Sequence, residues 1–103
     1  MAEMPSGTVT FMFTDLEGST VLWERHPDAM RAALARHDEL VGSAIEGRGG
    51  YVVKSTGDGF LAAFASASDA VAAAIDAQLA LAGEPWAETG PLRVRMGVHT
   101  GVA

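Results

Sequence analysis

The sequence has no cysteine, which excludes a disulfide framework and any zinc site built on thiolates. It also has no apolar run of about 20 residues, so we expect no membrane-spanning segment in this chain. The amino-terminal residues lack the basic and then apolar order of a signal peptide, which fits a cytoplasmic location.

Basic side chains are scarce. Seven Lys and Arg residues stand against 13 Asp and Glu residues, giving a net charge of −6. A nucleic-acid backbone is therefore disfavoured as a partner, because no basic stripe is available to displace its counterions. A mononucleotide stays possible, since a metal ion or a local cation pair can outweigh the overall charge.

What is present is a regular alternation of strand and helix signals over 103 residues with 49% hydrophobic content, enough for one core. We expect a strand over 8–14, a short helical turn near 21–23, a helix from Pro27, a hairpin over 51–64, a second long helix ending at Gly83, and a strand over 92–98. The order βαββαβ predicts an α+β, ferredoxin-like sandwich with helices on one face of an antiparallel-rich sheet.

Residue spacing also predicts which faces are buried. The stripe expected on the helix from Pro27 is Met30, Leu34, His37, Val41 and Ile45. The second long helix starts at a capping-box-like Ser66 and Asp69, and its expected buried stripe is Val71, Ile75, Leu79 and Ala82. The sheet face without helices is expected to be semi-polar, with members that include Thr10, Met12, Arg93 and Arg95.

Two aspartates are the candidate chemical groups. Asp58 lies in a tight turn between Gly57 and Gly59, and Asp15 follows the first strand. Right-handed crossovers place the third strand between the first and second, so the turn and the end of the first strand lie at the same edge. Asp58 alone could simply suit the turn, but this convergence favours a site.

Like charges held close together are costly unless a cation lies between them. Mg²⁺ and Mn²⁺ prefer carboxylate oxygens, and two such ions can hold an attacking and a leaving oxygen during displacement at phosphorus. The segment 16–20 opens a helix, so its N–H groups could receive phosphate or merely form an N-terminal cap. Lys54, considered by itself, is most simply a solvated strand lysine.

Three blocks of sequence carry a resemblance. Residues 13–20 (FTDLEGST), 54–60 (KSTGDGF) and 95–101 (RMGVHTG) resemble the class III nucleotide cyclases, in that family's order and spacing. The resemblance covers residues 1–103 as one domain, but only the amino-terminal part of the family's catalytic domain.

The resemblance implies that Asp15 and Asp58 hold two Mg²⁺ or Mn²⁺ ions, with the Leu16 carbonyl as a further ligand. It implies that phosphate contacts come from the amides of Gly18, Ser19 and Thr20. Lys54 matches a lysine that reads adenine, which favours ATP and its conversion to 3′,5′-cyclic AMP and pyrophosphate. It further implies a head-to-tail homodimer, in which Lys54 of one chain meets the aspartates of the other.

Alternatives remain at this stage. The family's second adenine-reading residue and its transition-state Asn and Arg lie beyond Ala103, so we expect weak or no activity from this chain alone. A non-catalytic nucleotide-sensing or dimerisation module is the main alternative. A guanylyl cyclase is disfavoured by Lys54, and the motifs of a diguanylate cyclase or polymerase palm fit less well. Arg93 and Arg95 are expected to be solvated or at an interface, without a catalytic role.

Overall fold

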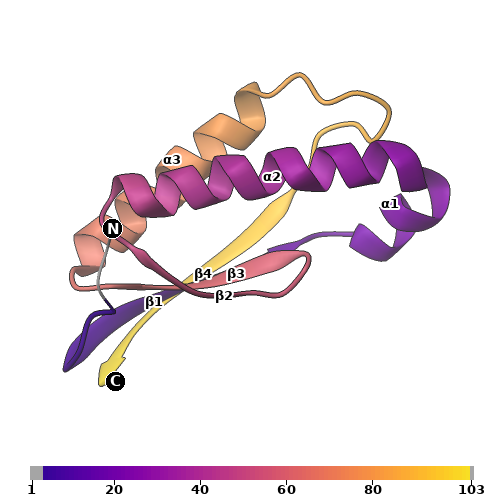
Figure 1. The fold of residues 1–103 in the computed structure, drawn as a ribbon. Coiled ribbons are helices and arrows are strands. Elements are labelled where there is room, and N and C mark those ends of the chain that lie inside the picture. The colour runs from indigo at the N-terminus through magenta and orange to yellow at the C-terminus, as the bar shows by residue number, and fades with distance from the viewer. Residues whose placement is uncertain (1–3, 103) are drawn as a thin grey trace.

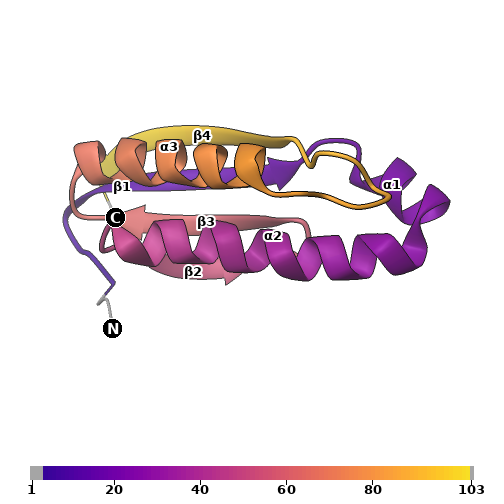
Figure 2. The ribbon, with the colours of Figure 1, turned by 90° about the horizontal axis from the view of Figure 1, so that it is seen from above.

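The computed structural model describes residues 4–102. Its elements are β1 (Thr8–Leu16), α1 (Ser19–Arg25), α2 (Pro27–Gly47), β2 (Tyr51–Ser55), β3 (Gly59–Phe64), α3 (Ala67–Gly83) and β4 (Val94–Val102). The two long helices lie on one face of the sheet (Figure 1). Seen from above, α2 and α3 run side by side over the strands (Figure 2). This two-layer arrangement confirms the predicted ferredoxin-like fold.

The four strands lie in the order β2-β3-β1-β4, and every neighbouring pair is antiparallel. As the crossover argument predicts, β3 lies between β1 and β2. The register pairs Asp15 with Gly59 of β3 on one side and with Arg95 of β4 on the other. The carboxyl end of β1 is therefore held between two neighbours, at the same end of the sheet as the β2–β3 turn (Figure 1).

Strand β1 is longer than predicted and ends at Leu16 rather than near Thr14. Its alternation also corrects one prediction, because Thr10 and Met12 are buried on the helix-covered side and not on the free face. Thr10 meets Thr100 of β4 there, with 2.8 Å between their hydroxyl oxygens. Successive strand residues point to opposite faces, so Phe13 and Asp15 lie on the free face.

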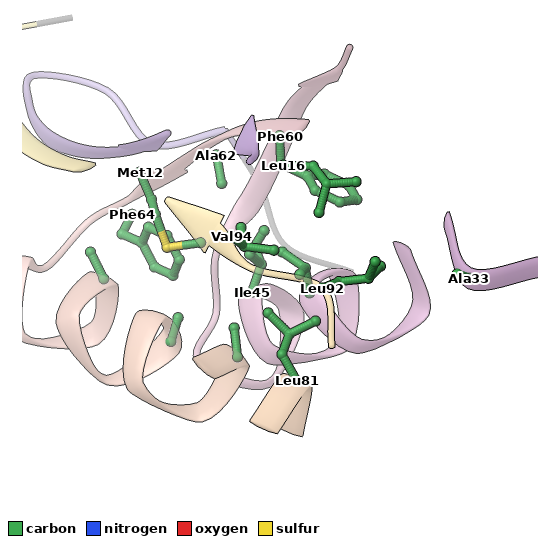
Figure 3. Packing of buried hydrophobic residues seen from close by; sticks show 14 of the residues in the cluster. Met12, Leu16, Ala33, Ile45, Phe60, Ala62, Phe64, Leu81, Leu92 and Val94 are labelled. Atoms are coloured by element: carbon green, nitrogen blue, oxygen red, sulfur yellow. The ribbon is translucent and has the colours of Figure 1, made fainter. Parts of the chain in front are cut away.

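Helix α2 buries the predicted side. Met30, His37, Val41 and Ile45 are fully buried, and Leu34 packs at the edge of the core. The core lies between the helices and the sheet, where side chains from both layers interdigitate (Figure 3). At the end of α2, the Arg48 guanidinium bonds Asp76 of α3 at 2.7 Å. This hydrogen bond lowers the pKa of the Asp76 carboxyl and ties the two helices together.

Helix α3 contradicts its predicted orientation. Val71, Ile75 and Leu79 are 48%, 55% and 67% exposed, and Ala82 is exposed too. The face that packs on the core consists of Ala70, Ala73, Ala77 and Leu81. The helix is apolar on several sides, so spacing alone does not identify one face. Small side chains let α3 approach the sheet and α2 closely, and this favours the alanine face.

No helix within residues 4–102 has the length and apolarity needed to cross a membrane.

The orientation of α3 predicts an unusual pair of stability effects. Ala77→Leu should destabilise the fold by about 1–3 kcal/mol, because the added carbons have no space in a packed interior. Leu79→Ala should change the free energy of unfolding by no more than about 0.5 kcal/mol, as expected for a surface position. Urea unfolding followed by circular dichroism measures both. A larger cost for Leu79→Ala would show that α3 packs with its large side chains inward.

Candidate functional site

The turn that carries Asp58 is fastened to the end of β1. The backbone N–H of Leu16 donates to the carbonyl of Asp58 at 3.0 Å, and within the turn the N–H of Thr56 donates to the carbonyl of Gly59 at 2.9 Å. Gly57 has φ of +84°, a left-handed conformation that suits glycine. The predicted convergence of Asp15 and Asp58 is therefore confirmed for the backbone. Their function as metal ligands remains a prediction.

Gly59 is the residue that permits this approach. A Cβ atom at this position would collide with the carbonyl oxygen of Thr14, a backbone atom that cannot rotate away. Thr14 itself is buried, and its hydroxyl accepts a hydrogen bond of 2.9 Å from the N–H of Phe60. The glycine after Asp58 is thus required by the close contact between β3 and β1.

The two carboxylates bond different neighbours. The Ser19 hydroxyl donates to Oδ2 of Asp58 at 3.1 Å, which directs that carboxylate towards the loop after β1. The Asp15 carboxylate instead bonds Arg95 of β4, which donates from Nε to Oδ1 at 2.8 Å and from Nη2 to Oδ2 at 2.7 Å. Both oxygens of Asp15 therefore have a guanidinium partner.

The partnership with Arg95 is the feature that the sequence prediction missed, since Arg95 was expected to be solvated or at an interface. It is exposed, but it is also a cross-strand neighbour of Asp15. The hydrogen bond and the negative charge of Asp15 raise the pKa of the Arg95 guanidinium above its ordinary value. Only the exact register of β4 against β1 could have revealed the pair. Arg93 remains exposed, and its backbone carbonyl accepts from the N–H of Glu17 at 2.8 Å.

The remaining predicted residues lie around this edge. Gly18 has φ of +69° and precedes the seven-residue helix α1, which begins with Ser19 and Thr20. Lys54 is exposed on β2 and opposes Leu61 of β3, which in turn opposes Phe13 of β1. Lys54 thus lies on the free face, two strands away from Asp15. A shallow pocket of about 350 Å³ on that face is lined by Phe13, Thr14, Asp15, Arg95, Met96 and Gly97.

The donor set fits a hard divalent cation. Asp15 and Asp58 supply carboxylate oxygens, the neighbouring Leu16 supplies a carbonyl, and Mg²⁺ or Mn²⁺ commonly completes such a set with water and substrate phosphates. Within residues 4–102 there is no cluster of three or more His, Asp or Glu side chains that could hold an ion without such help. An ion held by Asp15 and Asp58 would therefore need water or substrate oxygens as further ligands.

Comparisons with known proteins agree on one family. The model of the adenylate and guanylate cyclase catalytic domain matches residues 1–103. An adenylate cyclase of Lachancea kluyveri is 38% identical over 94% of this chain, and a receptor-type adenylate cyclase of Trypanosoma congolense is 47% identical over 76% of it. A structure of adenylate cyclases from Trypanosoma brucei in their monomeric state superposes with a TM-score of 0.88 and 34% identity over 97% of this chain. The chain spans 6% and 10% of the two relatives and 59% of the solved chain.

The close approach at Gly59 can be tested directly. Gly59→Ala should destabilise the fold by about 1–3 kcal/mol, because a buried backbone contact must open. Gly97→Ala on β4 is the matched control, since its Cβ meets nothing within 4 Å. Urea unfolding gives the free energies, and the amide NMR signal of Leu16 reports the bond to Asp58. Equal effects of the two substitutions would contradict the described contact.

Proposed function

The chain belongs to the adenylate and guanylate cyclase catalytic domain family, and we propose that the protein containing it converts ATP to 3′,5′-cyclic AMP and pyrophosphate. The observation that carries the proposal is the antiparallel register of β1 and β3, together with the bond between Leu16 and Asp58. It brings two acidic residues from distant parts of the chain to one edge of the sheet.

In the proposed reaction, the 3′-hydroxyl of the ribose loses its proton to water, and its oxygen attacks the α-phosphorus of ATP. The bond between that phosphorus and the oxygen bridging to the β-phosphorus breaks, and pyrophosphate leaves. Asp15, Asp58 and the Leu16 carbonyl would hold two Mg²⁺ or Mn²⁺ ions. When bound, such ions stabilise negative charge on the attacking oxygen and on the triphosphate.

The other residues of the chain position the nucleotide. The amides of Gly18, Ser19 and Thr20 would contact phosphate oxygens, and the hydroxyl of Ser19 already orients the Asp58 carboxylate. Lys54 would read adenine from the partner copy in a head-to-tail homodimer. Its exposed position on the free face of the sheet supports this, because a lysine pointing into the core could not reach a second chain.

The names of the relatives support adenylate cyclase activity over guanylate cyclase activity, and so does the match of Lys54 to the adenine-reading lysine.

A second candidate function is metal-dependent ATP binding without turnover. The specific observation that favours it is the complete pairing of Asp15 with Arg95, which leaves that carboxylate engaged in the structure described here.

Substitution of Asp58 tests the catalytic proposal. Asp58→Asn in the natural full-length protein should reduce cyclic AMP formation by at least about 100-fold, because even the outer partners of metal ligands are worth about 10–100-fold. Asp28→Asn is the matched control, since Asp28 lies exposed in the first turn of α2. Each protein is incubated with Mn²⁺ and ATP, and chromatography of the products gives the rate of cyclic AMP formation.

Running the same assay with ATP and GTP in competition identifies the substrate. Formation of cyclic AMP in preference to cyclic GMP is the expected result. Undiminished product from Asp58→Asn, or product formation in excess chelator, would refute the metal-dependent mechanism. ATP binding with no product from the wild-type protein would identify the second candidate function instead.

A further inference from the structure

The contact between Asp15 and Arg95 is bidentate, a geometry that adds specificity to an Arg–carboxylate pair. Two parallel N–H···O bonds of 2.7 and 2.8 Å join a planar guanidinium to both carboxylate oxygens. The two residues are direct cross-strand partners, so the backbone register fixes their separation. Both side chains remain about half exposed or more, at 51% for Asp15 and 66% for Arg95.

The two aspartates of the site consequently differ in the charge of their hydrogen-bond donors. The Asp58 carboxylate accepts one hydrogen bond from a neutral donor, the Ser19 hydroxyl. The Asp15 carboxylate accepts two hydrogen bonds from the positively charged guanidinium of Arg95. A divalent ion arriving at Asp15 thus meets a cation already in place, whereas no Lys, Arg or His side chain within residues 4–102 is bonded to the Asp58 carboxylate.

We infer that Arg95 acts as an internal cation that holds the Asp15 carboxylate until a divalent metal ion displaces it. This inference rests on the proposed function, because it takes Asp15 to be a metal ligand. The displacement costs little, since both side chains are more than half exposed and water screens their attraction. Arg95 then sets the metal affinity of the free site and keeps Asp15 in position for the exchange.

Metal affinity without nucleotide tests this exchange. Arg95→Gln should lower the Mn²⁺ dissociation constant by about two- to fivefold, the range that corresponds to an exposed pair. Arg95→Lys keeps the charge but loses the two-pronged geometry, so it should fall between the wild type and Arg95→Gln. Arg93→Gln is the matched control, because it removes the same charge two residues away without touching Asp15. Electron paramagnetic resonance reports the concentration of free Mn²⁺, and titrations of all four proteins followed in this way give their Mn²⁺ dissociation constants.

A second readout observes Arg95 itself. Mg²⁺ added to the ¹⁵N-labelled chain should shift the Nε–H signal of Arg95 and speed its exchange with water, because its bond to Asp15 is lost. The Nε–H of Arg48, which bonds Asp76 at 2.7 Å beyond the far end of α2, should not move. This internal control separates displacement from a general effect of salt.

The outcomes distinguish the two proposals. Equal Mn²⁺ affinities for wild type, Arg95→Gln and Arg93→Gln, with an unmoved Arg95 signal, would overturn the inference while leaving the metal site intact. Equal gains in affinity for Arg95→Gln and Arg93→Gln would overturn it too, because they would show a charge effect without displacement. No Mn²⁺ binding by any of the four proteins would overturn the metal site of the proposed function and this inference together.

Discussion

Backbone hydrogen bonding on both edges of β1 is the constraint on which the rest of the structure depends. On one edge the strand pairs with β3 so closely that only glycine fits at position 59. On the other edge it pairs with β4 over its whole length, from Thr8 to Leu16. The bond from Leu16 to Asp58 closes the arrangement at the strand end. The backbones of β1, β4 and the β2–β3 turn therefore come together at this end of the sheet.

The helix layer supports this strand through close packing. The alanines of α3 and the fully buried Met30, Val41 and Ile45 of α2 leave little free volume above the sheet. Close-packed interiors resist displacement of a strand by even small distances. The same packing leaves Val71, Ile75 and Leu79 outside, where they line an apolar groove of about 300 Å³ together with Met96 and Val98 of β4. The site and this groove lie on different parts of the sheet, since Asp15 belongs to the free face.

The sequence predicts the topology well because few arrangements satisfy a βαββαβ order with right-handed crossovers. It predicts the convergence of Asp15 and Asp58 for the same reason. It does not predict the orientation of α3, because alanine, valine and leucine are all apolar and the helix has several candidate faces. The placement of Thr10 and Met12 was wrong because one step along a strand exchanges the two faces. The pairing of Arg95 with Asp15 was missed because it depends on residue-level register between strands separated by 80 positions in the chain.

We propose that Asp15 and Asp58 form one cation site. Paramagnetic broadening by Mn²⁺ tests it most directly, because the effect on each amide signal falls steeply with distance from the ion. Substoichiometric Mn²⁺ added to the ¹⁵N-labelled chain should weaken the amide signals of Asp15, Leu16 and Asp58 together, while those of Asp28 and Asp69 keep their intensity. Broadening at Asp58 without broadening at Asp15 and Leu16, or the reverse, would contradict a shared site.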